Sequence, residues 1–260
     1  MLSHYTFRSL LFLLLVSFCI ACEGTKGEPQ NPLPDLQVLN PVILQQEGPE
    51  IHQFWEFADE AGLWETDFPI PGAIQTFRDS LLGAIGPDTL EFMLKRERSV
   101  TPKSDLPLDS LDNWQIVHQG YAGRIRDINY LEAQILNYQI SRFPLLSHPT
   151  EFHGFILNNE KADLIRVYIS ASDAPFPPKP YAVTDQVDSL TQQDWELIFH
   201  LHNHYRDPEE NYLGAMGPSM ADTHYFKNLH KRVGLGHALV TNGYTTCVIK
   251  PSELPTFNSH

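Results

Sequence analysis

The order of apolar patterns in the second half of the chain constrains the fold more than any other feature. Apolar residues recur at helical spacing from Ile125 to Ser141. The runs Glu151–Leu157 and Asp163–Ser170 then have the composition of two strands joined by a polar turn. This part of the sequence therefore predicts a helix followed by a pair of neighbouring strands.

The same alternation continues toward the C-terminus. Trp195–His202 is predicted to form a buried strand, and Pro218-Ser219 opens a helix that extends to Lys231. Ala238–Ile249 is predicted to form a hairpin across Asn242-Gly243, a strong two-residue turn signal. Helices alternating with strands in this way indicate an α/β domain.

The preceding segment, residues 35–118, carries no recognisable chemistry. Ile51–Leu63 and Ala73–Leu82 have amphipathic patterns, and Thr89–Arg96 has the pattern of a short helix. We therefore expect a mainly helical N-terminal segment whose aromatic residues pack in a core rather than line a peptide groove. Residues 253–260 are expected to form a tail.

The first 21 residues have the features of a secretion signal, which is excluded from the fold. Arg8 precedes an apolar run from Leu10 to Ile20 that is too short to span a bilayer comfortably. The run ends in Cys-Ile-Ala-Cys22, which is similar to a bacterial lipobox, so Cys22 is the expected lipidation site. An ordinary cleaved signal and an uncleaved anchor are the alternatives. Residues 22–34 are polar, contain Gly and Pro, and are expected to form a flexible tether.

Charge and cysteine content restrict the partners and the chemistry. The net charge is -14, and it becomes -15 without Arg8 of the leader (17 basic against 32 acidic residues). So acidic a chain is a poor partner for nucleic acid or anionic lipid headgroups. Apart from the leader and Cys22, only Cys247 remains, so the mature chain has no internal disulfide. Cys247 is expected to be a buried structural thiol rather than a nucleophile.

Three histidines stand at the end of the Trp195–His202 strand. Side chains alternate along a strand, so His200, His202 and His204 point to one side. Two of them could bind Zn²⁺, with a carboxylate from the later helix as third ligand and the fourth position open. A single histidine in such a place is more often a satisfied core or surface residue, and three at this spacing favour the metal site.

Ser219-Met-Ala-Asp222 has two interpretations. Ser-x-x-Asp after a proline is the pattern of a helix cap, in which the serine accepts a backbone N–H and the acid lies at the positive end of the helix. An aspartate in the capped, rigid first turn of a helix is also well placed to direct its carboxylate toward a metal site. The two interpretations are compatible.

These motifs together resemble the JAB/MPN (JAMM) zinc metalloproteases. The signature of that family is His-x-His followed by Ser-x-x-Asp. It is similar to His202-Asn-His204, followed here by Asp207-Pro208 and Gly217-Pro218-Ser219-x-x-Asp222, and the His-Asn-His sequence is similar to that of the RadC-like branch. Glu151-Phe-His-Gly154 looks like the family's Glu-x-x-Gly strand, and the helix before it comes in the right order. The resemblance covers residues 120–251. It implies a cytidine-deaminase-like JAB1/MPN architecture, a mixed β-sheet flanked by helices, for a domain over residues 119–252.

The resemblance also implies a role for each site residue. His202, His204 and Asp222 would be the zinc ligands, Glu151 the general base, and Ser219 a hydrogen-bond donor to the developing oxyanion. These roles describe a zinc-dependent metallopeptidase or isopeptidase. With a lipoprotein leader, the enzyme would work in the bacterial cell envelope on a peptide, a peptidoglycan-type crosslink or an exported protein. A non-catalytic binding module is the first alternative, and a nucleic-acid-associated protein conflicts with the leader and the charge.

The sequence departs from the family pattern in the segment after the histidines. Tyr205 stands where a proline is usual, and 17 residues separate His204 from Asp222. The extra Glu209–Met216 is expected to be a loop insertion at the mouth of the site, with a role either in substrate selection or as passive surface. A second register, with His200 and His202 as the ligands, remains an alternative.

Overall fold

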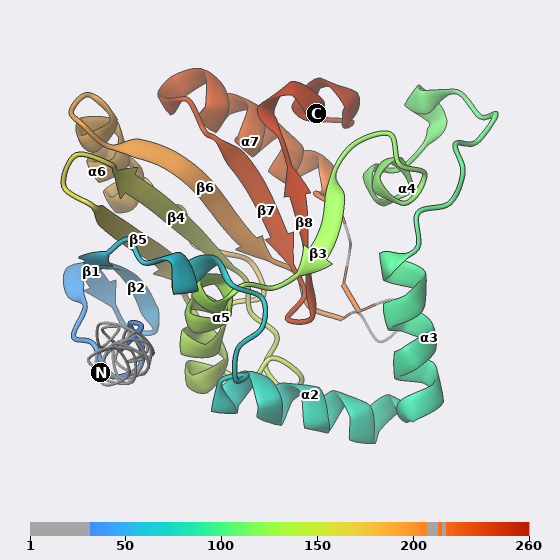
Figure 1. Ribbon diagram of the computed structural model, residues 1–260, viewed down its shortest axis with the longest axis horizontal. Helices are drawn as coiled ribbons and strands as arrows, with labels where there is room; N and C mark the ends of the chain where they lie inside the picture. Colours follow the sequence, from blue (N-terminus) through green and yellow to red (C-terminus); the bar gives the residue numbers. More distant parts are fainter. Residues whose placement is uncertain (1–31, 207–212, 215–216, 260) are drawn as a thin grey trace, which may run out of the picture. The chain divides into compact units, whose positions relative to one another are not determined.

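An eight-stranded sheet is the frame of the protein (Figure 1). The computed structural model describes residues 32–206, 213–214 and 217–259. The strand order is β1-β2-β5-β4-β6-β7-β8-β3, and every neighbouring pair is antiparallel except the parallel pair β6 and β7. The strands are β1 Val42–Glu47, β2 Glu50–Ala58, β3 Arg124–Asp127, β4 Phe152–Asn159, β5 Leu164–Ala171, β6 Glu196–Asn203, β7 His237–Thr241 and β8 Thr245–Ile249. The predicted α/β class with a mixed sheet is confirmed.

Helices cover both faces of this sheet. The α-helices are α2 Gly72–Ile85, α3 Pro87–Arg98, α4 Asn113–His118, α5 Tyr130–Arg142, α6 Tyr181–Thr191 and α7 Met220–Val233. Short 3-10 helices are η1 Ala61–Trp64, η2 Leu108–Ser110 and η3 Pro251–Thr256. Figure 1 shows α5 in front of the sheet and α6 and α7 behind it.

A hydrophobic core lies between the sheet and α4, α6, α7 and η3. Phe226 and Leu229 of α7 pack with Val183 and Val187 of α6 on the apolar side chains of the inner strands. Leu254 and Phe257 are 3% and 2% exposed and belong to the same core. The expected tail at residues 253–260 therefore contributes to the fold through its described part, residues 253–259.

The opposite face of the sheet is covered by α5, on which α2 packs. Glu132 of α5 accepts a hydrogen bond from Thr246 of β8 at 2.8 Å, and Gln139 donates one to the carbonyl of Ser172 after β5 at 3.0 Å. These buried polar contacts fix α5 across the width of the sheet, because each one satisfies a group that water cannot reach.

The segment 35–118 is only partly helical. The helices expected at Ala73–Leu82 and Thr89–Arg96 are confirmed by α2 and α3, but the helix expected over Ile51–Leu63 is wrong. Those residues form β2 and η1 instead. Strand β2 pairs with β5 and so belongs to the common sheet. Ile51, Phe54 and Trp55 have helical spacing, yet along β2 they divide between the two faces of the sheet. Residues 35–118 are thus part of one compact unit, Pro34–His260.

The helix expected from Ile125 begins later than the pattern suggested. Arg124–Asp127 is the edge strand β3, paired with β8, and α5 starts at Tyr130. Asn129 caps α5 by accepting from the backbone N–H of Glu132 at 2.8 Å, and Glu132 accepts the backbone N–H of Asn129 at 3.2 Å. This capping box, Asn-x-x-Glu, marks the true start of the helix, whereas the apolar spacing began four residues earlier, at Ile125.

Several other elements agree with their predictions, whereas β1, α4 and α6 were not predicted with these bounds. Strands β4, β5 and β6, helix α7 and the β7–β8 hairpin lie where the patterns placed them. Cys247 is buried, as expected. The leader, Cys22 and most of the tether lie outside the described residues, as do residues 209–212 and 215–216 of the expected insertion. Among the described residues, no helix has the length and apolar character needed to cross a membrane.

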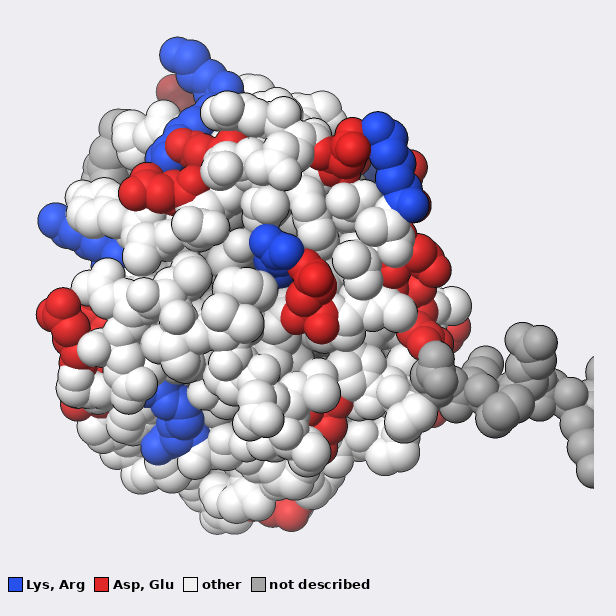
Figure 2. All heavy atoms as spheres, turned by 90° about the vertical axis from the view of Figure 1, so that its left-hand side faces the viewer, with Lys and Arg blue, Asp and Glu red and all other residues white. Residues whose placement is uncertain are grey.

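Charged side chains are dispersed on the face of the molecule seen in Figure 2. Lysine and arginine occur singly there, several of them beside aspartate or glutamate. Elsewhere, too, basic side chains pair with acidic ones at the surface, as Lys161 does with Asp194 and Arg232 with Asp188. The acidic excess of the sequence is therefore accompanied by local compensation on this face.

Candidate metal centre

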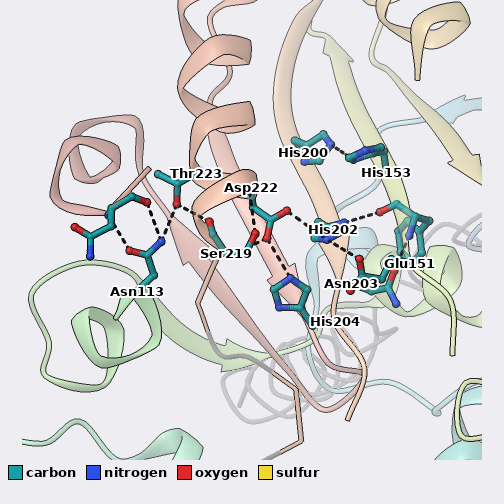
Figure 3. A network of polar contacts seen from close by, with 12 residues as sticks. Asn113, Glu151, His153, His200, His202, Asn203, His204, Ser219, Asp222 and Thr223 are labelled. Carbon is teal, nitrogen blue, oxygen red and sulfur yellow. Dashed lines mark hydrogen bonds and ion pairs between the residues drawn. The ribbon is translucent and has the colours of Figure 1, made fainter. Parts of the chain in front are cut away.

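Three segments that are distant in sequence meet at one end of β6 (Figure 3). His202 is the penultimate residue of β6 and His204 is the first residue after the strand, while Asp222 is the third residue of α7. Helix α7 connects β6 to its parallel neighbour β7, so its N-terminus returns to the carboxyl end of β6. Glu151, directly before β4, joins from the adjacent strand. The topology therefore gathers two imidazoles and two carboxylates in one place.

The distances fit a small divalent ion. His202 Nε2 lies 3.5 Å from Asp222 Oδ1, and His204 Nε2 lies 3.2 Å from Asp222 Oδ2. Ligand atoms about 2.0 to 2.1 Å from a tetrahedral ion are separated by roughly 3.3 Å. The ligand atoms of Glu151, His202 and His204 also lie within 4.8 Å of one another. This buried group could hold a metal ion.

His202 is oriented as a ligand. Its Nδ1 lies 2.9 Å from the carbonyl oxygen of Phe152, which fixes the tautomer with the proton on Nδ1 and directs the lone pair of Nε2 toward both carboxylates. Burial lowers the pKa of His202 to about 4, against the opposing charge of Asp222. His202 is therefore neutral at physiological pH, as a metal ligand must be.

Asp222 and Ser219 form the predicted helix cap. Ser219 Oγ accepts the backbone N–H of Asp222 at 3.1 Å, and Asp222 Oδ2 accepts the backbone N–H of Ser219 at 2.8 Å. Burial raises the pKa of Asp222, but hydrogen bonds from His204 and Ser219 and the charges of His202 and His204 more than offset it, so the net shift is downward. Capping and direction of the carboxylate toward the histidines thus occur together.

Glu151 has the properties of a proton acceptor near neutral pH. Its Oε2 lies 3.5 Å from His202 Nε2, and its side chain is 17% exposed. Burial raises the pKa of Glu151 to about 7, with His204 lowering it and Asp222 raising it. A carboxylate whose pKa lies close to the working pH is well suited to take up and return a proton.

His200 belongs to a second pair behind this group. All three histidines of the strand contact α7, as their alternation predicted, but the polar partner of His200 Nε2 is His153 Nδ1 at 3.2 Å. His153 also stacks on His202 with ring centroids 5.6 Å apart. Asp222 therefore lies beside His202 and His204, whereas no carboxylate among the described residues forms an ion pair with His200, the other histidine of the alternative register.

Asn203 is a supporting residue that the sequence did not single out. Its Nδ2 donates to the carbonyl of Thr150 and its Oδ1 accepts the backbone N–H of Phe152, both at 2.9 Å. Both neighbours of Glu151 are thereby fixed to the end of β6. In the sequence, Asn203 stood out only as the middle residue of the His-Asn-His motif, with no indication of these two partners.

Glu97 of α3 is a second such residue. It is 1% exposed, and it accepts the backbone N–H of Leu213 and the side-chain N–H of Asn242, both at 2.8 Å. A Cβ built on Gly214 would lie 3.5 Å from the carbonyl carbon of His204, so Leu213 and Gly214 lie beside the histidines. Glu97 connects α3 to this part of the site.

The buried Glu97 makes stability depend on pH. Burial raises its pKa from 4.5 to about 7, so the folded state binds the proton more tightly than the unfolded state. The contribution of Glu97 to the free energy of unfolding is fully present below pH 4.5 and is lost as the pH rises through about 7. Between pH 5 and pH 8 we expect the free energy of unfolding of the wild type to fall by about 2 to 3 kcal/mol more than that of Glu97→Gln. Urea denaturation at the two pH values measures this, and equal losses in both proteins would contradict it.

Comparison with known proteins gives no further assignment. No protein-family model, no curated protein and no solved structure matches the chain. The candidate centre therefore rests on the geometry and chemistry of its own residues.

Proposed function

We propose that the protein is a zinc-dependent hydrolase of amide bonds, a metallopeptidase or isopeptidase of the JAB1/MPN type. His202, His204 and Asp222 would hold the ion. The convergence of these three residues with Glu151, at separations suited to one tetrahedral ion, carries the proposal. The order α5, β4, β5, α6, β6, α7, β7, with a helix before the Glu151 strand and another between the histidines and β7, supports the family resemblance.

Two imidazoles and a carboxylate suit zinc, because nitrogen donors of intermediate softness with one oxygen match its preferences. When bound, zinc would polarise the scissile carbonyl and lower the pKa of a water toward about 7. Glu151 would accept the proton of that water and deliver it to the leaving amine. Asn203 would keep Glu151 in place through the main chain on either side of it.

Ser219 would donate its hydroxyl hydrogen to the oxyanion. Its oxygen accepts the backbone N–H of Asp222 in the helix cap, which places the hydroxyl at the exposed start of α7. Ser219→Gly is expected to lower kcat by roughly 10²- to 10³-fold. Glycine keeps most of the capping energy, so the helix should lose only a few tenths of a kcal/mol. A Ser219→Gly protein with wild-type kcat would show that Ser219 is a cap alone.

A non-catalytic binding module with a structural metal is the second candidate. Glu151 Oε2 is as far from His202 Nε2 as Asp222 Oδ1 is, 3.5 Å in both cases. With Glu151 as a fourth protein ligand the site would be closed, as structural zinc sites are. The role of Glu151 therefore separates the two candidates.

The proposal is tested by exposing a peptide library to the zinc-loaded protein. We expect new N-termini at defined amide bonds, identified by mass spectrometry. A library that stays intact would contradict amide hydrolysis of peptides.

We also propose that the protein is a lipoprotein of the bacterial cell envelope, anchored through Cys22. The support is the leader and the lipobox-like sequence. In a bacterial host, the wild type is expected in the membrane fraction with an acylated N-terminal Cys22, and Cys22→Ser is expected in the soluble fraction. A mature N-terminus elsewhere, or unchanged partitioning of Cys22→Ser, would contradict lipidation.

A further inference from the structure

A cavity of about 200 Å³ opens beside Ser219. Its lining includes Asn113 and Trp114 of α4, Pro218, Ser219 and Met220 at the start of α7, and Asn258. Figure 3 shows Ser219 between Asn113 on one side and Asp222 with His204 on the other. The cavity and the candidate metal centre therefore share a wall.

The buried polar side chain of the cavity wall is already satisfied. Asn113, which is 6% exposed, donates to Thr223 Oγ1 at 3.1 Å and to the carbonyl of Asn258 at 3.0 Å, and its Oδ1 accepts the backbone N–H of Asn258 at 2.8 Å. Apart from Ser219 and Asp112, the wall offers an occupant the apolar surface of Trp114, Pro218 and Met220, the last of which is 46% exposed. An apolar group gains most from such a surface.

The position of the cavity wall is fixed by a close backbone approach. A Cβ on Gly217 would lie 3.0 Å from the carbonyl oxygen of Asn113 and 3.2 Å from Trp114 Cα. Helix α4 therefore packs directly on the chain that leads to Ser219. The cavity is built into the fold by this contact and by the hydrogen bonds of Asn113.

We propose that this cavity is the subsite for an apolar side chain of the substrate, on a residue adjacent to the scissile amide. The inference rests on the proposed function and extends it to the class of substrate. Because Ser219 lines the cavity, a substrate whose carbonyl reaches Ser219 has a neighbouring residue within reach of it. An apolar cavity of about 150 Å³ holds benzene, so this one accommodates a leucine or phenylalanine side chain. The exposed carboxylate of Asp112 at its edge disfavours acidic residues.

The first test measures cleavage. A peptide library randomised on both sides of the cut is expected to show at least about a 10-fold preference for Leu or Phe over Gly at one adjacent position. Trp114→Ala should reduce the preference to less than about 3-fold with its zinc content unchanged, whereas Phe92→Ala, an exposed control on α3, should keep it. Cleavage with no such preference, or a preference that Trp114→Ala retains, would overturn the inference.

The second test does not depend on catalysis. The full chain labelled with ¹³C-methyl methionine is titrated with N-acetyl-leucine amide and N-acetyl-glycine amide, and the signals are assigned with Met220→Leu. We expect a saturable shift of Met220 with the leucine probe only, no shift of the buried Met93, and loss of the shift in Trp114→Ala. A Met220 signal that ignores the leucine probe overturns the subsite, whereas an uncut library combined with the expected shift contradicts only the proposed hydrolase.

Discussion

Replacing Glu151 by glutamine is expected to lower kcat/KM for amide cleavage by roughly 10²- to 10⁴-fold, while the protein still holds about one zinc per chain. Glutamine has nearly the same shape, but it cannot accept the proton of the attacking water. The pKa of Glu151, raised by burial to about 7, gives its carboxylate the proton affinity that this step needs. Kinetics on the cleaved library peptide and metal analysis by mass spectrometry give the two readings.

Glu160→Gln is the matched control for this experiment. Glu160 is an exposed residue directly after β4, the strand that Glu151 precedes, so its change should leave both the rate and the zinc content as in the wild type. A Glu151→Gln protein with full activity would exclude Glu151 as the base. If Glu151→Gln lost its zinc, Glu151 would be a ligand, and the closed structural site would be the better description.

Replacing His204 by alanine is expected to abolish stable metal binding and, with it, the activity. The change removes one of three ligands and leaves Asp222 Oδ2 without the imidazole 3.2 Å away. Loss of a supporting residue costs about 10- to 100-fold in metal affinity, so loss of a ligand should weaken binding by more than 100-fold. Zinc content after dialysis and a competition titration with a chelating dye measure this.

His224→Ala is the control for the ligand experiment. His224 lies on an exposed part of α7, two residues beyond Asp222, and belongs to the same helix without facing the site. It should retain one zinc per chain. A His204→Ala protein that also retains a full equivalent would contradict the ligand assignment.

Much of the sheet and the outline of the site could be predicted because their signals are local. The strands β4, β5 and β6 have short apolar runs between turn residues, and Asn242-Gly243 marks the β7–β8 hairpin. His202 and His204 fall on one side because side chains alternate along a strand. The cap formed by Ser219 and Asp222 can be predicted from four consecutive residues. In each case a few neighbouring residues determine the conformation.

The parts that could not be predicted depend on contacts between distant segments. The pattern of β2 fits a helix as well as a strand, and its pairing with β5, more than 100 residues later, decides between them. Asn203 and Glu97 have nothing in their local sequence that indicates their partners, because Thr150, Phe152, Leu213 and Asn242 come from other elements. The same holds for the cavity at Ser219, whose wall joins α4 to α7.

The most direct measurement of the central claim is the rate of peptide cleavage by one preparation before and after removal of its metal. The purified protein is treated with a chelator, freed of it, and assayed on the library with no ion added and with one equivalent of Zn²⁺. We expect no cleavage by the metal-free protein and recovery of the original rate at one zinc per chain. Undiminished cleavage by the metal-free protein, or an intact library after one zinc per chain has bound, would contradict a zinc-dependent amide hydrolase built on His202, His204 and Asp222.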